Sequence, residues 1–466
     1  MKHLVYSNKI VIYLTYDEFD KDSIYSYYLN NKLVEKGLIT NCSFSNLKGD
    51  TLYQVMVKKD YKVIFEDKIK TSLKRKDILV KVSDNTGKVV VTKEVQSYLD
   101  LANSSNRIVF PKGTYLFSGL LLHSHTEVYL ESGAILLGSK SCSDYKVFDV
   151  PENVQLRTDI EMIPQYFGFK KRDEYRRAMF SAYGEEDITI TGEPGSIIDG
   201  RNCYDAQGEE GYRGPHGIFL SNCRNIALKG YTIQHSGNFM HQLDACSDIT
   251  MADVTCLGGS DGIHLHCCEN TEIERCVFRT GDDCIAGINI RDLHINNCVL
   301  NSSCQAFRIG GVGILAENCH IYGPGYYPHR VTVVKSENDI LPREAGRHNL
   351  VSMIIFFASE TFPAKEYSQN IVFRNMIVEN AGHILEYTAN CSDNLQAGDL
   401  LKELTFENVR FTGLEKSSRV HGSKEVPLNI RLKNVTAEFL TGLGSLFDPE
   451  STDIIITETK SDEVMK

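Results

Sequence analysis

The sequence predicts an all-β protein, a right-handed parallel β-helix (solenoid) preceded by a small antiparallel β-sandwich. Three observations support this fold class. Short alternating strands fill the first 80 or so residues, similar strand–corner–strand units recur between about residues 85 and 440, and cysteines recur within those units at nearly constant spacing. We therefore divide the chain into a sandwich over residues 1–82 and a β-helix domain over residues 83–466.

The N-terminal region alternates apolar and polar residues in short runs, and polar turns such as Asn30-Asn31 separate them. The corner Leu47–Tyr53 resembles the corner of fibronectin type III domains, in which a tyrosine hydroxyl ties the loop to the strand. A fibronectin type III-like sandwich is the favoured interpretation, and another small antiparallel sheet is the alternative. The expected strands are Ile10–Tyr16, Ser26–Leu29, Asn41–Phe44, Leu52–Lys58 and Ile78–Val82.

A short amphipathic helix is expected over Glu94–Ala102, because Val95, Leu99 and Ala102 recur at helical spacing. A helix at the first turn of a solenoid protects an otherwise open hydrophobic end and sheet edge.

The repeated unit consists of a strand, a small or Asn-containing corner, and a second strand. Periods of about 20–25 residues with two or three short strands indicate a parallel β-helix, since each strand pairs with its counterpart one turn on. Leucine-rich repeats share this period, but their leucine-dominated signature is absent. The copies begin at Asp187, Asn225, Asp248, Asn270, Asp292, Gly313, Asn370 and Glu403, and Leu428–Phe439 is the last.

The cysteines give the period of this repeat. Cys256, Cys276, Cys298 and Cys319 are 20, 22 and 21 residues apart, and Cys223, Cys246 and Cys268 are 23 and 22 apart. Residues at one solenoid position stack about 4.8 Å apart, and buried thiols act there as small hydrophobic groups. No Cys-x-x-Cys pair is present, so stacking is favoured over a zinc site.

Composition and charge restrict the partners. The net charge of −11 and the lack of a basic stripe argue against nucleic acid, and no apolar run approaches a membrane span. The first residues contain no signal-peptide-like run, so we expect a cytoplasmic protein with reduced thiols, or an exported one if a signal has been removed.

Three carboxylates occur on neighbouring turns of the predicted solenoid. Asp261 lies in Gly258-Gly-Ser-Asp-Gly-Ile, and Asp282 and Asp283 lie in Gly281-Asp-Asp-Cys-Ile-Ala, 21 residues after Asp261 in the case of Asp282. Carboxylates this close repel each other, which raises the proton affinity of at least one. A neutral acid beside ionised carboxylates is what glycosidic bond cleavage needs, although Asp-Asp and Ser-Asp-Gly are also common at turns.

The alternation of inward and outward side chains along a strand predicts which residues near Asp261 face outward. Ile263 and Leu265 take the core, so Asp261 and His264 are expected on or near the outer face. His241, on the preceding turn, is expected to face the same surface, with a solvated outer-face histidine as the alternative for both histidines.

These motifs resemble glycoside hydrolase family 28, the polygalacturonases, over residues 85 to 440. The resemblance rests on Val109-Phe-Pro-Lys-Gly-Thr-Tyr, on Ile198-Asp-Gly, on Gly258-Gly-Ser-Asp-Gly-Ile for the family's Asn-Thr-Asp-Gly-Ile, and on Gly281-Asp-Asp-Cys-Ile-Ala, which matches outright. It implies that Asp282 is the general acid and that Asp261 and Asp283 activate water, with inversion and with no metal or organic cofactor.

The chain departs from the family pattern around these acids. Gln305 stands where the family has the histidine of Gly-His-Gly, and Gly259 replaces the Asn of Asn-Thr-Asp. Arg308 is expected to point outward one turn beyond the Asp pair, where a guanidinium could bind a substrate carboxylate or hydroxyl. The family's Arg-x-Lys is not cleanly present. The candidates near its place, in the long connection 324–366, are Arg330, Lys335, Arg343 and Arg347, with His329 and His348.

The leading hypothesis is an inverting, exo-acting hydrolase of galacturonic-acid-containing oligosaccharides, with His241, His264, Gln305, Arg308, Arg330 and Lys335 as candidate substrate-binding residues. One alternative is a Ca²⁺-dependent polysaccharide lyase with an arginine base, because Arg308 stands beside three Asp where the family histidine is missing. A non-catalytic carbohydrate-binding β-helix is the third possibility.

Overall fold

The computed structural model describes residues 1–5, 9–14, 20, 23–37, 39, 41–71, 75–149, 176–208, 211–329, 346–360, 364, 366–442 and 444–459. The chain forms two compact units. One comprises Met1–Asp77 with Ser104–Arg107, and the other comprises Ile78–Asn103 with Ile108–Lys466. The boundary expected after residue 82 therefore falls inside the second unit.

The first unit is built from two antiparallel sheets. One has the order β1 (Lys2–Val5), β2 (Ile10–Tyr13), β5 (Asn41–Phe44), and the other has the order β4 (Lys32–Gly37), β3 (Tyr25–Leu29), β6 (Leu52–Lys59), β7 (Lys62–Lys70). Buried side chains from both sheets form one core, as a sandwich requires. They are Ile10, Ile12, Leu14, Tyr25, Tyr27, Cys42, Phe44, Val55, Val57 and Ile69.

Two turns of this unit follow from the sequence. Asn30 and Asn31 have φ of 47° and 64°, the left-handed conformation that a tight hairpin between β3 and β4 requires. The Tyr53 hydroxyl accepts a hydrogen bond of 2.8 Å from the Lys48 backbone N–H, so the tyrosine ties the expected corner. The sequence did not indicate β1, β4 or β7, and the fibronectin type III assignment stays a prediction.

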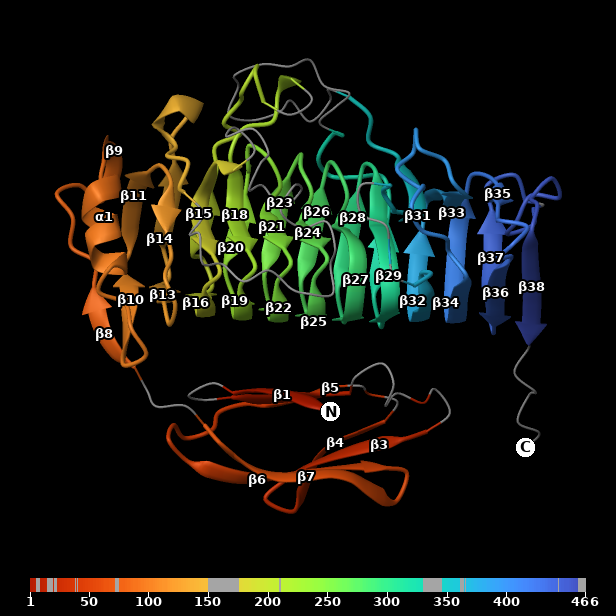
Figure 1. The fold of residues 1–466 in the computed structure, drawn as a ribbon, viewed down its shortest axis with the longest axis horizontal. Helices are drawn as coiled ribbons and strands as arrows, with labels where there is room; N and C mark the ends of the chain where they lie inside the picture. The colour runs from red at the N-terminus through yellow and green to blue at the C-terminus, as the bar shows by residue number, and fades with distance from the viewer. Residues whose placement is uncertain are drawn as a thin grey trace. The chain divides into compact units, whose positions relative to one another are not determined.

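The second unit contains the predicted parallel β-helix, in which strands repeat in three sets and pair in parallel with their counterparts one turn on (Figure 1). The set that carries the candidate site comprises β12 (Leu120–Leu121), β15 (Ala178–Tyr183), β18 (His216–Ser221), β21 (His241–Asp244), β24 (Ile263–His266), β31 (Leu350–Phe356), β33 (Ala381–Thr388) and β35 (Val420–His421). Strands β27 (Ile285–Asn296) and β29 (Gln305–Glu317) are long enough to continue both this set and the next.

The remaining strands complete the turns. The second set comprises β8 (Lys76–Leu79), β10 (Asn106–Phe110), β13 (Glu127–Leu130), β16 (Glu186–Gly192), β19 (Arg224–Lys229), β22 (Ser247–Ala252), β25 (Glu269–Glu274), β32 (Gln369–Glu379), β34 (Glu403–Leu414), β36 (Leu428–Lys433) and β38 (Ile454–Thr459). The third set comprises β9 (Thr86–Val90), β11 (Gly113–Phe117), β14 (Ala134–Gly138), β17 (Ile197–Asp199), β20 (Thr232–Gln234), β23 (Thr255–Gly258), β26 (Val277–Thr280), β28 (Val299–Ser302), β30 (His320–Tyr322) and β37 (Thr436–Phe439).

The Asn and Asp residues that begin the repeats form the corners. Asn225, Asp248, Asn270 and Asp292 have φ between 54° and 56°, a conformation that these side chains tolerate better than others. Their side chains also stack, since Asn270 Nδ2 donates to Asp248 Oδ1 over 3.1 Å. The sequence period is therefore one turn of the solenoid.

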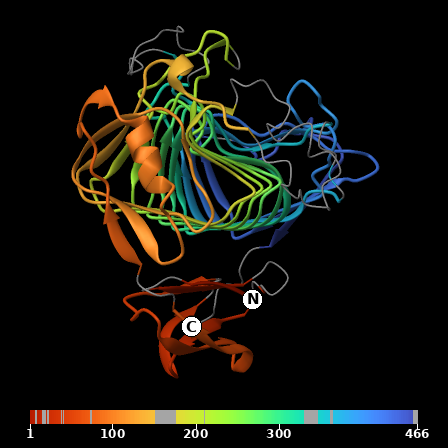
Figure 2. The ribbon, with the colours of Figure 1, turned by 60° about the vertical axis from the view of Figure 1, so that its left-hand side comes forward.

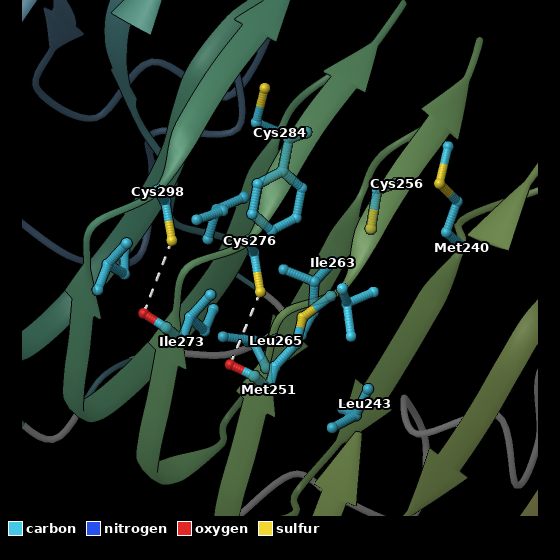
Figure 3. Close-up of a cluster of buried hydrophobic side chains, with 14 of the residues drawn as sticks. Met240, Leu243, Met251, Cys256, Ile263, Leu265, Ile273, Cys276, Cys284 and Cys298 are labelled. Carbon is cyan, nitrogen blue, oxygen red and sulfur yellow. Dashed lines mark hydrogen bonds between the residues drawn. The ribbon is translucent and has the colours of Figure 1, made fainter. Parts of the chain in front are cut away.

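Cysteines stack in the core of the β-helix, as Figure 3 shows. The thiols of Cys276 and Cys298 each lie 3.7 Å from a carbonyl oxygen of the preceding turn, those of Met251 and Ile273. One expectation was wrong: Cys256 pairs with Phe278 and does not continue the Cys276 series, because the strands here pair residues 22 apart and the two cysteines are 20 apart. All fourteen cysteines are free thiols.

The expected helix is present as α1 (Thr92–Leu99). Val95 and Leu99 are buried in the β-helix core, so the helix covers its first turns (Figure 2). No helix in the described part of the chain is long and apolar enough to cross a membrane.

Candidate active site

The three aspartates lie in the short connections that enter two neighbouring strands of the same set. Asp261 precedes β24, and Asp282 and Asp283 precede β27. The Gly262 N–H donates to the Asp283 carbonyl oxygen over 3.0 Å, so Asp283, rather than Asp282, lies opposite Asp261 on the next turn. Carboxylate oxygens of all three lie within 4.8 Å of one another, and the side chains are buried.

The Gly-Asp-Asp segment is held tightly. The Asp282 carbonyl oxygen accepts hydrogen bonds of 2.7 Å from the hydroxyls of both Thr280 and Ser302. A Cβ at Gly281 would lie 2.0 Å from the Pro328 carbonyl oxygen, which leaves room only for glycine. The close approach of the 328 connection therefore depends on Gly281.

Arg213 and His329 contact Asp282, and neither was recognised as a partner of this acid from the sequence. An Arg213 Nη atom donates to Asp282 Oδ2 over 2.9 Å, with both side chains buried. His329 Nε2 lies 3.8 Å from Asp282 Oδ1. Arg213 lies just before β18, and an isolated bridge to Tyr204 holds its backbone. Each oxygen of the Asp282 carboxylate thus faces a cationic or potentially cationic group.

Arg308 lies where the sequence predicts, on the outer face one turn beyond the Asp pair. It pairs with Ala286 of β27, and its Nη1 lies 3.8 Å from Asp283 Oδ2. Its guanidinium stacks 4.6 Å from the centre of the Phe357 ring. Arg308 Nε is buried and has no hydrogen-bond partner among the described residues, which leaves a donor for a ligand oxygen.

His264 also reaches the acids. Its Nδ1 lies 3.0 Å from Asp261 Oδ2, and its ring is 4.5 Å from that of Phe239 and 4.4 Å from that of His266. His266 in turn lies 3.3 Å from Asp244. His264, His266 and Asp244 therefore form a connected polar network beside Asp261.

The environment separates the proton affinities of the three acids. Burial raises the pKa of Asp261 well above its usual range, and the Asp282 and Asp283 charges raise it further. Burial and the Asp282 charge raise the pKa of Asp283 to about 7. Burial also opposes ionisation of Asp282, but the Arg213 and His329 charges outweigh it and lower the pKa of Asp282 below its ordinary value. The site therefore offers ionised and neutral carboxyl groups at neutral pH.

His241 does not belong to this surface, contrary to expectation. It lies on β21 in register with Ile218, and like Leu243 it points into the core. Both ring nitrogens are satisfied there, by the Gly262 carbonyl at 2.8 Å and the Tyr231 hydroxyl at 2.9 Å. Burial lowers the pKa of His241 to about 4, so the ring is neutral and structural.

The other candidates are placed as follows. Gln305 opens β29, and its carbonyl accepts a hydrogen bond from the Cys284 N–H at 3.1 Å. Arg347 donates to the Cys304 thiol over 3.5 Å, beside the acids. Three further candidates, Arg330, Lys335 and Arg343, lie outside the described residues.

The carboxylate oxygens are close enough to share a cation, and Ca²⁺ prefers such ligands. However, Arg213 and Arg308 already face two of the three acids. Two permanent guanidinium charges oppose a divalent ion at the same place and account for how three acids can be buried together.

Comparisons with known proteins cover the part of the chain that carries this site. The model of glycosyl hydrolases family 28 matches residues 143–318, which include all three aspartates, Arg213 and Arg308. A probable polygalacturonase of Vitis vinifera is 28% identical over 193 residues, which cover 39% of this chain. The match spans 36% of the length of that relative.

Solved structures show the same fold at low identity. A family 28 exopolygalacturonase of Yersinia enterocolitica superposes with a TM-score of 0.60 at 16% identity, over 100% of this chain and 99% of the other. An exopolygalacturonase of Thermotoga maritima gives 0.57 at 14% identity, over 78% and 87%. The sequence of residues 143–318 therefore resembles glycosyl hydrolases family 28, and the chain shares the β-helix fold of these solved structures.

Proposed function

We propose that this protein is an inverting glycoside hydrolase that cleaves α-glycosidic bonds in galacturonic-acid-containing oligosaccharides, with exo action. The observation that carries the proposal is the buried cluster of Asp261, Asp282 and Asp283, in which neighbouring charges separate the proton affinities. Hydrolysis needs one group to protonate the leaving oxygen and another to deprotonate water, and such a cluster supplies both.

An acidic substrate is supported by the cationic side chains around the acids. Arg308 presents a buried Nε donor with no partner in the described part of the chain, and a guanidinium binds a uronate carboxylate in a bidentate manner. Exo action is supported by the names of the two structurally similar enzymes, both exopolygalacturonases.

The test is incubation with defined oligogalacturonides and rhamnogalacturonan fragments, followed by proton NMR of the first product. We expect a saturated product of inverted anomeric configuration, released from one chain end. Asp282→Asn with full activity on every oligogalacturonide would contradict the proposal.

The same experiment decides between the alternatives. Arg308 beside three acids also resembles the base of a Ca²⁺-dependent lyase, which would give an unsaturated, ultraviolet-absorbing product and lose activity with a chelator. Binding without turnover would indicate a carbohydrate-binding protein.

A further inference from the structure

Two cysteines lie in contact outside the stacked core of the β-helix. Cys142 begins the 3₁₀-helix η2 (Cys142–Asp144) in the connection after β14, and Cys203 lies in the connection after β17, one turn on. Their Sγ atoms are 3.3 Å apart, and both residues are free thiols. A disulfide bond of about 2.0 Å therefore requires the two sulfurs to approach by only about 1.3 Å.

The two thiols differ in their access to solvent. Cys142 is half-buried, whereas Cys203 is 2% exposed. A reagent from solvent therefore reaches Cys142 first, and Cys203 is placed to attack the sulfur of Cys142 afterwards. The cysteines that stack in the core, such as Cys246 and Cys276, are fully buried, which shields them from the same reagent in the folded protein.

The surroundings of Cys142 favour its thiolate, which is the reactive form of a cysteine. The contact with Cys203 lowers the pKa of Cys142 most, and the Arg177 charge lowers it further. Burial and the charges of Asp205 and Asp144 oppose this shift without cancelling it. Cys142 is therefore suited to be the attacking thiolate.

A surface hollow of about 240 Å³ gives a small molecule room beside Cys142. Its lining includes both cysteines and the cationic residues Lys140 and Arg201. Cationic side chains raise the local concentration of an anionic reagent. The hollow therefore fits a small disulfide that carries carboxylates.

The cysteine pair is joined to the segment that carries Arg213. The Cys142 thiol donates to the Tyr204 carbonyl oxygen over 3.3 Å, and Tyr204 forms the isolated bridge with Arg213. A Cβ at Gly214 would collide with the Cys203 carbonyl oxygen, so the residue after Arg213 also packs against this pair. A bond between the two sulfurs would tie the Arg213 segment to the connection of the preceding turn.

We propose that Cys142 and Cys203 are a redox modification site, at which a low-molecular-weight disulfide with carboxylates oxidises both thiols to a disulfide that fixes the Arg213 segment. The Cys142 thiolate bonds to one sulfur of the reagent, whose S–S bond breaks and releases one thiolate. Cys203 then loses its proton and bonds to Cys142 Sγ, and the second half of the reagent leaves as a thiolate. The two protein thiols are oxidised, and the reagent is reduced to two thiols that take up both protons.

Oxidation of the full-length protein in glutathione buffers tests the site. We expect peptide mapping by mass spectrometry to find a Cys142–Cys203 disulfide that increases with the ratio of glutathione disulfide to glutathione and is reversed by dithiothreitol. Lys140→Gln should slow the reaction with glutathione disulfide more than the reaction with cystamine, a cationic disulfide. Equal slowing of both reactions, or no Cys142–Cys203 disulfide at any ratio in the folded protein, overturns the inference.

Single substitutions test the order of attack. Cys203→Ser should stop the reaction at the mixed disulfide of Cys142 with glutathione, and Cys142→Ser should leave the buried Cys203 unmodified. The matched control is Cys391→Ser, which removes another half-buried thiol and should leave formation of the Cys142–Cys203 disulfide unchanged. A glutathione adduct on Cys203 in the Cys142→Ser protein would contradict the assignment.

Hydrogen exchange measures the effect on the Arg213 segment. Peptides that contain Tyr204 and Arg213 should exchange their amide hydrogens about threefold or more slowly in the oxidised than in the reduced wild type. Cys142→Ser, treated with the same buffers, should show no such difference. Equal exchange in the two wild-type states would overturn the inference. These readouts use no oligosaccharide, so their outcome is independent of the proposed hydrolase function.

Discussion

A buried ionic ladder across strands β25, β27, β29 and β32 of the β-helix is the basis of the first prediction. His294 on β27 lies 2.9 Å from Glu272 on β25 through Nδ1 and 2.9 Å from Glu317 on β29 through Nε2. Glu317 also pairs with Arg374 on β32 at 2.8 Å. Glu317 and Arg374 are fully buried, so water does not screen their charges.

The loss of stability expected on replacing His294 follows from the protonation of its ring. Burial alone would lower its pKa, but the carboxylates of Glu272 and Glu317 outweigh burial and raise the pKa from 6.5 to about 10. At about 1.4 kcal/mol per tenfold change, this corresponds to about 5 kcal/mol in favour of the charged form. Removing one partner of a buried pair costs about 3–5 kcal/mol, so we expect His294→Gln to destabilise the β-helix by about that amount at pH 6.

The sign of the pH dependence is fixed by the direction of the shift. The folded pKa of His294 lies above the unfolded value, so its contribution is fully present below pH 6.5 and disappears as pH rises through about 10. The difference in unfolding free energy between the wild type and His294→Gln should therefore shrink steadily across that interval.

Urea denaturation followed by circular dichroism at several pH values between 6 and 10 measures this difference. The matched control is His320→Gln, because His320 forms a similar 2.5 Å pair with Glu379 but both side chains are more than 40% exposed. The control should cost no more than about 1 kcal/mol. A His294→Gln protein as stable as the control at pH 6, or a difference that grows with pH, would refute the reasoning.

Three further predictions concern the site. Asp282→Asn should lower kcat on oligogalacturonides by about a hundredfold or more, with binding retained in calorimetry; an equal loss of binding would point to a folding defect. Arg308→Gln should weaken binding of a uronate more than of a matched neutral oligosaccharide, and equal weakening would remove Arg308 from substrate recognition. Gly281→Ala should lower the melting temperature, because the added Cβ meets the Pro328 carbonyl at 2.0 Å; an unchanged Tm would show that the 328 connection can move away at little cost.

The β-helix could be predicted from the sequence because its repeats follow one nearly constant spacing. The Asn and Asp corners and the 20–23-residue period require each strand to pair with its counterpart one turn on, which also placed Arg308 beside the Asp pair. The repeat period gives the length of one solenoid turn, but it does not give which residues of neighbouring turns pair or which of them face the core. Cys256 was therefore placed in the wrong stack, and His241 on the wrong face, since a histidine with both nitrogens bonded can take a core position.

The partners of Asp282 could not be predicted in the same way. Arg213 and His329 lie in connections that interrupt the repeat, and a repeat pattern carries no information about the path of such segments. Arg213 forms an isolated bridge with Tyr204, and the His329 N–H donates a hydrogen bond of 2.8 Å to the Arg347 carbonyl oxygen. Only the folded chain shows that the two connections meet at one carboxylate.

The repeats and the connections between them contribute different parts of the site. The repeats hold the acids, since backbone bonds to the neighbouring turns at Asp261 and Asp283 leave little freedom at either position. The connections hold two of the groups that decide which acid is ionised, Arg213 and His329. A change in a connection can therefore alter proton affinity and substrate preference without disturbing the solenoid. Gln305 in place of the family histidine leaves Arg213 and His329 unaffected, and these two groups have the largest charge effects on Asp282 and lie in connections rather than on the strand of Gln305.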